Sequence, residues 1–362
     1  MPKIRVLMID DAVVIRRLVS DVLNADPAIE VVGTAANGRI GLAKLPQVNP
    51  DLVTLDIEMP EMDGLETLAA IRKAYPLLPV IMFSTLTERG AAATLDALSL
   101  GANDYVTKPA NVGSVAAAIE RVRDELLPKI KLFCRHILGP AASSNFVAAG
   151  AKAGSTAAPR KAAAKIELLA IGASTGGPNA LAAVLPELPG DFPVPIVIVQ
   201  HMPPVFTRSM AERLDARAAI AVSEAAAGEV IQPGHAYVAP GDFHMALVRN
   251  EPRARLRLHQ APPENSCRPA VDVLFRSVAE VFGGASLAVV LTGMGKDGLN
   301  GCGTIREAGG QVLAQDEATS VVWGMPGFVA KAGLADQILP LERIATEIVR
   351  RTKLGRSLPL LA

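Results

Sequence analysis

The feature that most constrains this chain is an alternation of short apolar runs with amphipathic stretches, from residue 3 to about residue 125. Apolar runs of four to eight residues are typical of strands, and apolar positions three to four apart are typical of helices. The predicted strands are 4–9, 30–35, 51–56, 79–84 and 104–109, and helices are predicted at, for instance, 13–23 and 65–75. This alternation predicts a doubly wound, parallel α/β sheet.

The alternation resumes at residue 166. Strands are predicted at 166–174, 194–200 and 285–293, and helices at 179–188 and 207–216. Two shorter runs, 235–240 and 254–260, are bounded by turn residues and are expected to add antiparallel strands. The chain is therefore expected to contain a second α/β domain with a largely parallel sheet.

The segment between the two alternating regions has a different composition. Residues 115–138 are expected to form a final helix and its extension, whereas 141–165 contain Ala, Gly, Ser and Lys with almost no large apolar side chains. Such a segment cannot build its own core and predicts a linker, with an Ala-rich helical connector as the alternative. We place a first domain at 1–125, a linker at 126–165 and a second domain at 166–355.

Charge and cysteine usage exclude several classes of protein. The 362 residues include 36 basic and 36 acidic side chains, which argues against a broad electrostatic grip on nucleic acid or anionic lipid. The three cysteines, Cys134, Cys267 and Cys302, have no metal-ligand spacing and are expected to be free thiols. The first apolar run is too short for a signal peptide, and no stretch has the length of a membrane span. We expect a cytoplasmic monomer with no membrane insertion.

Polar side chains stand at the ends of the predicted strands of the first domain. These residues are Asp10, Asp11, Asp56, Ser84 and Lys108. The carboxyl ends of parallel strands meet at one edge of a sheet, where ligands bind. Gathered oxygens suit Mg²⁺, a central carboxylate can attack a phosphoryl group, and an ammonium and a hydroxyl can stabilise the added charge. Singly, the first aspartates could cap a helix and the lysine could be a loop residue.

The first domain closely resembles the receiver domains of two-component response regulators. The resemblance is carried by MIDD (8–11), LDIEMPEMDGLE (55–66), FSTL (83–86) and YVTKP (105–109). It implies a flavodoxin-like fold and a histidine kinase as phosphodonor. It also implies a role for each matching residue: Asp56 as phosphoacceptor, Mg²⁺ bound by Asp10, Asp11, Asp56 and the main-chain carbonyl of Glu58, and a switch formed by Ser84, Tyr105 and Lys108.

Three strand ends of the second domain carry Ser174, His201 and Asp297. A serine hydroxyl becomes a good nucleophile when a histidine takes its proton and a carboxylate holds that histidine. GASTG at 172–176 fits the G-x-S-x-G turn that exposes a nucleophilic serine. We expect the backbone amides of Thr175 and Met294 to form an oxyanion hole.

Other readings of these residues weaken the assignment. GASTGGP could be a phosphate-binding turn, although it lacks both the G-x-G-x-x-G order and the lysine of a P-loop. Asp297 could simply form a turn. The chain order Ser, His, Asp differs from that of α/β-hydrolases, but triads occur in several orders. The residues alone leave the triad and these alternatives open.

The second domain resembles the catalytic domain of the chemotaxis protein-glutamate methylesterases. The motifs are AIGASTGGP (170–178), QHMPPVFTRSMAERL (200–214), PGHAYVAPGDFHM (233–245), RPAVDVLF (268–275), LTGMGKDG (291–298) and WGMPG (323–327). The resemblance implies that Ser174, His201 and Asp297 are the catalytic triad and that the Thr175 hydroxyl supports the site. It further implies hydrolysis of glutamate methyl esters on methylated chemoreceptors, with release of methanol, and in some members deamidation of receptor glutamine. No cofactor is expected for the esterase.

Two alternative functions follow from the same features. A response regulator whose second domain only binds a partner protein would keep the receiver and make Ser174 dispensable. A DNA-binding regulator would need a helix-turn-helix or a basic stripe, and neither is evident. For the methylesterase, the fusion leads to the hypothesis that the unphosphorylated receiver hinders the substrate and that phosphorylation of Asp56 relieves this.

Overall fold

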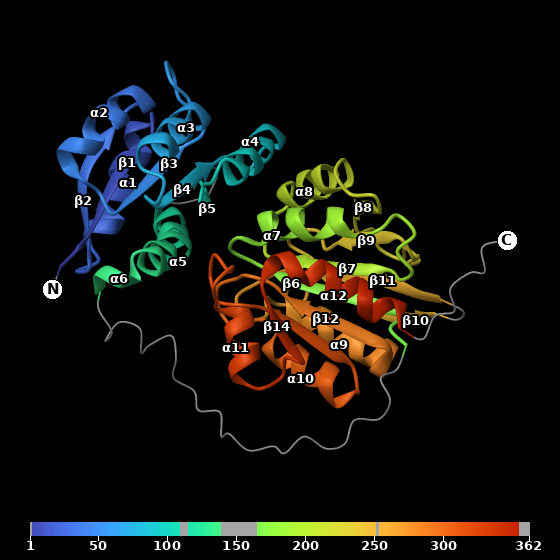
Figure 1. Cartoon of the computed structure of the whole chain (residues 1–362). Helices are drawn as coiled ribbons and strands as arrows, with labels where there is room; N and C mark the ends of the chain where they lie inside the picture. The colour runs from blue at the N-terminus through green and yellow to red at the C-terminus, as the bar shows by residue number, and fades with distance from the viewer. Residues whose placement is uncertain (1, 109–114, 139–164, 251–252, 355–362) are drawn as a thin grey trace. The chain divides into compact units, whose positions relative to one another are not determined.

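The computed structural model describes residues 2–108, 115–138, 165–250 and 253–354. The chain divides into two compact units, Met1–Gly150 and Ala151–Ala362 (Figure 1), and each is considered by itself. The predicted linker segment 141–165 lies almost entirely outside the described residues.

The first unit is a five-stranded parallel sheet in the order β2-β1-β3-β4-β5. The strands are β1 (Ile4–Ile9), β2 (Ile29–Ala35), β3 (Leu52–Asp56), β4 (Val80–Ser84) and β5 (Asp104–Thr107). The helices are α1 (Val13–Asn24), α2 (Gly38–Val48), α3 (Gly64–Ala74), α4 (Glu88–Ser99), α5 (Val115–Phe133) and α6 (Arg135–Leu138). The predicted flavodoxin-like, doubly wound fold is confirmed. The direction of connection reverses between β1 and β3, and ligands of such sheets bind outside that point.

The core of this unit extends beyond residue 125, where the sequence placed the end of the domain. Leu126 and Ile130 on α5, together with Cys134, are buried with Ile4 and Val6 of β1. Apolar residues at this helical spacing form a stripe that packs on the sheet. Residues 126–138 therefore belong to the first unit and not to a linker.

The second unit contains a seven-stranded sheet in the order β14-β13-β12-β6-β7-β9-β8, with parallel pairing throughout. Its strands are β6 (Leu168–Ala173), β7 (Ile196–Gln200), β8 (Ala221–Glu224), β9 (His235–Val238), β12 (Ser286–Val290), β13 (Gln311–Gln315) and β14 (Gln337–Leu339). The helices are α7 (Gly177–Val184), α8 (Phe206–Asp215), α9 (Val271–Phe282), α10 (Leu299–Glu307), α11 (Met325–Lys331) and α12 (Leu341–Lys353). Short 3₁₀ turns, η2 (Leu185–Glu187) and η3 (Gly283–Ala285), follow α7 and α9.

One part of the strand prediction is wrong. Residues 235–240 were expected to add antiparallel character, but β9, within this range, pairs in parallel with both β7 and β8 inside the main sheet. The antiparallel element is instead a separate hairpin of β10 (His244–Asn250) and β11 (Arg253–His259). A short strand next to Pro and Gly has the same local sequence pattern in a parallel and in an antiparallel sheet. Its pairing direction depends on the connection to the neighbouring strand and not on local composition.

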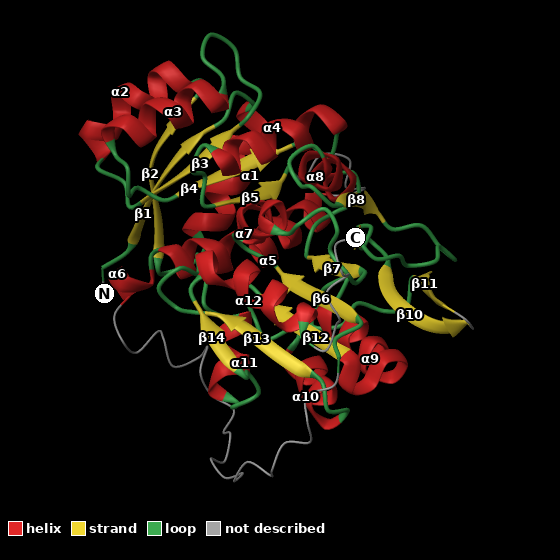
Figure 2. Ribbon diagram, turned by 45° about the vertical axis from the view of Figure 1, so that its right-hand side comes forward, coloured by secondary structure: helices red, strands yellow, loops and turns green. Residues whose placement is uncertain are grey.

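The helices of the second unit form two groups around its sheet (Figure 2). Helix α10 contacts both α9 and α11, while α7 contacts α8 and α12. A large core cluster joins the sheet to α9 and to the β10–β11 hairpin, and includes Leu168, Val197, Leu247 and Leu274. Strand β6 connects towards β7 and β12 connects towards β13, so the order reverses between β6 and β12. The crevice for a ligand is expected at their carboxyl ends.

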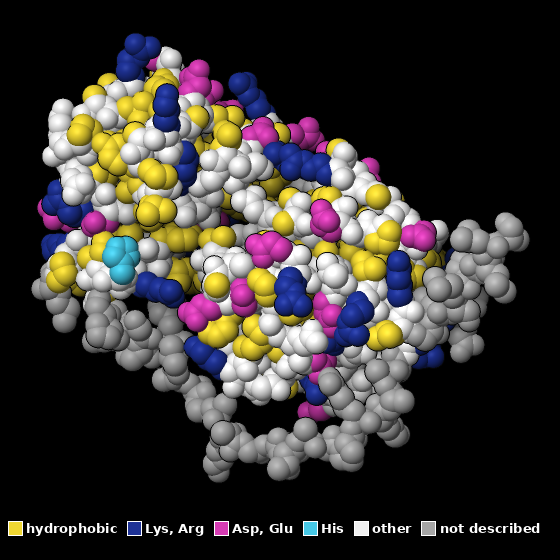
Figure 3. All heavy atoms as spheres, viewed as in Figure 1, with side chains coloured by type: hydrophobic (Ala, Val, Ile, Leu, Met, Phe, Trp, Pro, Cys, Tyr) yellow, Lys and Arg dark blue, Asp and Glu magenta, His cyan; other side chains and the backbone are white. Residues whose placement is uncertain are grey.

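The surface agrees with the balanced charge of the sequence. On the face seen in Figure 3, Lys and Arg side chains are interspersed with Asp and Glu. None of the described helices is long and apolar enough to cross a membrane.

Candidate active site and phosphoacceptor site

The strand ends of the first unit bring three predicted residues into contact. Asp10 directly follows β1, Asp56 ends β3, and Lys108 follows β5. Lys108 Nζ lies 2.5 Å from Asp56 Oδ2 and 3.2 Å from Asp10 Oδ2. All three side chains are largely buried, so the ammonium faces two carboxylates away from bulk water.

The same edge carries a group of carboxylates suited to a cation. One carboxylate oxygen each from Asp10, Asp11 and Asp56 lies within 4.8 Å of the others. Oδ2 of Asp10 is buried and accepts no hydrogen bond from a described residue, although Lys108 lies nearby. Burial raises the pKa of Asp10, and burial together with the charge of Asp10 raises the pKa of Asp56 to about 7. A hard divalent cation with oxygen ligands would offset this cost, so the residues fit Mg²⁺.

The predicted switch residues occupy buried positions. Ser84 ends β4, and its hydroxyl donates to the carbonyl of Gly90 at 3.1 Å while accepting from the Thr94 hydroxyl at 2.7 Å. Tyr105 is buried in β5, and Lys129 Nζ lies 5.4 Å from the centre of its ring. Both side chains are thus held by α4 and α5, the elements next to their strands.

Three strand ends of the second unit carry the predicted serine constellation. Ser174 directly follows β6, His201 follows β7, and Asp297 lies in the loop between β12 and α10. Strands β12, β6 and β7 are neighbours in the sheet. The Ser174 amide donates to Thr292 at 3.0 Å, and Gln200 Nε2 donates to the Ser174 carbonyl at 2.9 Å. The serine is therefore attached by its backbone to both neighbouring strand ends.

His201 and Asp297 are in direct contact. His201 Nε2 lies 2.7 Å from Asp297 Oδ2, and the exposed fractions of the two side chains are 12% and 3%. Because a carboxylate only accepts, Nε2 carries the proton and Nδ1 of the neutral ring is left as the acceptor. Among the described residues, the Ser174 hydroxyl has no hydrogen-bond partner. The contact between catalytic groups in unliganded proteins often forms only with substrate bound.

Hydrogen bonds keep Asp297 ionised. Burial alone would raise the pKa of Asp297, but the hydrogen bond from His201 and those from the Val271 and Asp272 amides lower it below its usual value. For His201, burial would lower the pKa, yet Cys267 and Asp297 together raise it to about 10. The histidine is therefore set to hold a proton strongly, as an imidazolium formed during catalysis must.

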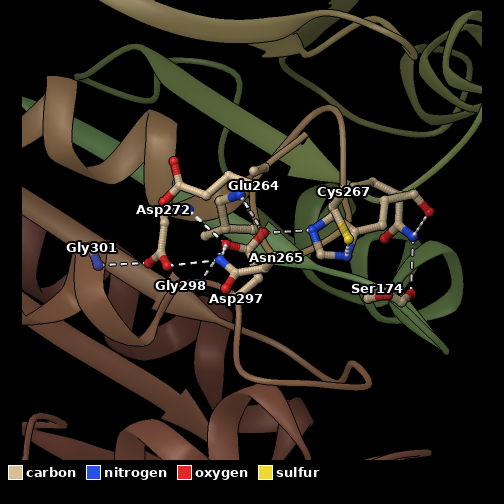
Figure 4. Close-up of polar contacts among 12 residues, drawn as sticks. Ser174, Glu264, Asn265, Cys267, Asp272, Asp297, Gly298 and Gly301 are labelled. Atoms are coloured by element: carbon tan, nitrogen blue, oxygen red, sulfur yellow. Dashed lines mark hydrogen bonds and ion pairs between the residues drawn. The ribbon is translucent and has the colours of Figure 1, made fainter. Parts of the chain in front are cut away.

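Two neighbours of this pair were not expected at this site from the sequence (Figure 4). Asn265 Nδ2 donates to Asp297 Oδ1 at 2.9 Å and to Asp272 Oδ2 at 3.0 Å, and Cys267 Sγ lies 3.5 Å from His201 Nδ1. Both residues lie in the loop before α9, far in sequence from His201 and Asp297. Their only sequence signal was their place directly before the RPAVDVLF motif.

One predicted oxyanion donor, Thr175, directly follows the serine, and the other, Met294, lies in the loop after β12. The Thr175 carbonyl accepts a hydrogen bond from the Thr292 hydroxyl at 2.9 Å. Met294 follows Gly293, and its amide donates to no described residue. A Cβ on Gly293 would lie 2.9 Å from Ser174 Cβ, which is shorter than real contacts allow. This glycine lets the loop after β12 approach the serine closely.

Comparison with known proteins agrees with both sites. The CheB methylesterase family matches residues 169–348, and the response regulator receiver domain family matches 6–120. A protein-glutamate methylesterase/protein-glutamine glutaminase of Trichodesmium erythraeum is 58% identical over 97% of this chain and 99% of its own length. One from a Nocardioides species is 57% identical over 100% of this chain and 98% of its own. The crystal structure of the Thermotoga maritima CheB methylesterase catalytic domain is 44% identical, with a TM-score of 0.51, and covers 52% of this chain and 99% of that domain.

The identity and coverage extend over both units, so the resemblance concerns the whole architecture. The chain therefore belongs to the CheB family, the receiver-regulated protein-glutamate methylesterases and protein-glutamine glutaminases of chemotaxis adaptation.

Proposed function

We propose that Ser174, His201 and Asp297 carry out ester hydrolysis on methylated glutamates of chemoreceptors. The observation that carries the proposal is the hydrogen bond from His201 Nε2 to the buried Asp297 carboxylate, which leaves Nδ1 as the base. Ser174 stands at the adjacent strand end with its hydroxyl available. A base, a carboxylate that orients it and a nucleophile are the parts that acyl transfer requires.

The chemistry then proceeds in two stages. Nδ1 of His201 takes the Ser174 proton as the hydroxyl oxygen attacks the ester carbonyl, and the imidazolium returns that proton to methanol as the ester bond breaks. Water next attacks the acyl-serine with the same histidine as base, releasing glutamate and restoring Ser174. Replacing methanol by ammonia as the leaving group gives glutamine deamidation on the same residues.

Backbone amides stabilise the charge on the carbonyl oxygen. The Met294 amide has no described partner, so it can donate to the oxyanion, and the Thr175 amide lies at the start of α7 beside the nucleophile. Preorganised donors of this kind contribute roughly 100-fold to 1,000-fold each to the rate of acyl transfer.

Phosphorylation acts on the first unit. A histidine kinase is the phosphodonor, and Asp56 accepts the phosphoryl group beside Lys108. Asp10, Asp11 and Asp56 would hold Mg²⁺, together with the main-chain carbonyl of Glu58. The bound cation would supply positive charge that offsets the negative charge of carboxylates and phosphoryl oxygens. The Ser84 hydroxyl, which now contacts Thr94 and Gly90, turns to the phosphoryl group, and Tyr105 repacks. Lys108 pairs with the added charge.

The first experiment is methanol release from methylated receptor membranes by wild type and Ser174→Ala, each with and without a small phosphodonor. Release by wild type alone, increased by the donor, supports both the triad and control by the receiver. Asp56→Asn should ignore the donor. Release that persists in Ser174→Ala contradicts the nucleophile, and no release from wild type favours a module that only binds a partner.

A further inference from the structure

Cys267 lies against the ring nitrogen that hydrolysis needs. Its Sγ is 3.5 Å from His201 Nδ1, while Asp297 Oδ2 is 2.7 Å from Nε2. The imidazole thus lies between a thiol and a carboxylate. Figure 4 labels the two residues that supply these groups, Cys267 and Asp297. Because the base for Ser174 is also Nδ1, the thiol and the serine hydroxyl compete for one atom.

The loop that carries Cys267 is held in place. Cys267 and Glu264 exchange two backbone hydrogen bonds of 2.9 and 3.1 Å, and Glu264 forms an ion pair with Arg276 of α9 at 2.6 Å. Asn265, between them, ties the same loop to Asp297. These contacts fix the backbone of the loop, and the fixed loop places the thiol of Cys267 against the ring of His201.

We propose that Cys267 is a positioning residue of the esterase, whose thiol holds Nδ1 of His201 and sets the pH at which the ring becomes available to Ser174. While Nδ1 lies against the sulfur, the histidine cannot take the proton of Ser174. Hydrolysis therefore needs the ring turned from Cys267 to Ser174.

The charges around the ring support this role. Burial alone would lower the pKa of His201, while Cys267, from the loop before α9, and Asp297, from the loop after β12, raise it to about 10. Behind Asp297 lie Asp272 and Glu264, which interact with its charge. Removing the thiol leaves Asp297 in place and so isolates the effect of Cys267.

The activity test compares the pH dependence of kcat/KM for wild type, Cys267→Ala and Cys267→Ser. Loss of the thiol should move the acidic limb to lower pH by about 1 to 3 units in both variants, the range typical of a neighbouring charge. Serine still offers a hydrogen bond to Nδ1, so Cys267→Ser should keep a plateau near that of wild type while Cys267→Ala loses part of it. If the acidic limb of the kcat/KM profile stays at the wild-type pH in both variants, the proposal is overturned, because a purely structural role of Cys267 would lower only the plateau.

A second readout requires no ester hydrolysis, so it is independent of the proposed function. Iodoacetamide alkylates a thiolate: sulfur attacks carbon, the carbon–iodine bond breaks and iodide leaves. Cys134 and Cys302 are buried, and burial raises the pKa of both, so they serve as unreactive internal controls. Mass spectrometry of the full chain should show Cys267 modified first, and His201→Gln should slow this about tenfold or more, because the imidazolium stabilises the thiolate.

The two readouts separate the proposal from the assigned activity. An unchanged alkylation rate in His201→Gln overturns the role of Cys267 even if the wild type releases methanol. Slower alkylation in His201→Gln upholds the thiol–imidazole pair even if no methanol is released, in which case only the triad assignment fails.

Discussion

At the scale of single residues, the carboxylate of Asp297 is the most heavily bonded group of the esterase site. It accepts hydrogen bonds from His201, Asn265 and the amides of Val271, Asp272 and Gly298. Such a set fixes both oxygens, so the carboxylate orients the histidine with little freedom. Asn265 supplies the only side-chain amide in this set, and it also joins Asp272 to Asp297.

Replacing Asn265 by glycine should lower kcat about tenfold, as expected from losing a hydrogen bond to a charged group. Glycine is the better replacement because Asn265 has φ 53°, where alanine would add backbone strain. Methanol release measures the effect, and Asn300→Ala on the exposed surface of α10 is the control. Equal rates in both variants would show that Asn265 does not position Asp297.

The charged carboxylate of Asp56 is costly in the folded receiver. Burial and the charge of Asp10 raise its pKa from 3.8 to about 7. Between these values the folded state binds a proton that the unfolded chain has released, so the receiver loses stability as the pH rises through this range. A cation bound beside this carboxylate would offset the cost of its charge.

Asp56→Asn should therefore stabilise the first unit without Mg²⁺ at about pH 8, by up to about 4 kcal/mol, and have little effect below about pH 4. Calorimetry of the full chain at several pH values measures this, with the exposed Asp21→Asn as control. Adding Mg²⁺ should reduce the difference, because the cation stabilises the wild-type carboxylate only. A difference that is constant with pH would contradict the raised pKa.

At the scale of elements, strands and helices followed the apolar pattern closely. The strand predicted at 4–9 is β1, and the helix predicted at 13–23 is α1 with one more residue. The pattern did not indicate how β9 pairs, because a four-residue strand between turns carries no information on direction. It also placed one helix over 179–188, where α7 tightens into a 3₁₀ turn at Leu185.

Gly293 lets the loop after β12 approach Ser174 closely. A Cβ at this position would lie 2.4 Å from Met325 Sδ and 2.9 Å from Ser174 Cβ. Gly293→Ala should destabilise the second unit by about 1 to 3 kcal/mol and reduce methanol release. Gly303→Ala in α10 is the matched control, since its Cβ would meet no atom within 4 Å and should stabilise the helix. If Gly293→Ala and Gly303→Ala changed the thermal stability and the activity by the same amount, the proposed role of Gly293 would be contradicted.

At the scale of the whole molecule, two independent cores are joined in one chain. Each unit has its own sheet and its own buried cluster. Under the hypothesis that the unphosphorylated receiver hinders the substrate, phosphorylation shifts the chain between two populations.

Removing residues 1–140 should raise basal methanol release from receptors above that of the unphosphorylated full chain, because the inhibiting unit is lost. The truncated enzyme should not respond to a phosphodonor. Full-length Asp56→Asn is the control, since it keeps the receiver and should stay at the basal rate. A truncated enzyme slower than the full chain would contradict inhibition by the receiver.

The sequence by itself determined the two α/β units and the strand ends on which Asp56, Ser174, His201 and Asp297 lie. It could do so because apolar periodicity and short motifs are local, and because parallel strands place their carboxyl ends at one edge. Only the tertiary structure decided that Asn265 and Cys267 lie against that site. Their loop leads into α9 and contacts His201 and Asp297, and contacts between residues distant in the sequence leave no periodic trace in it.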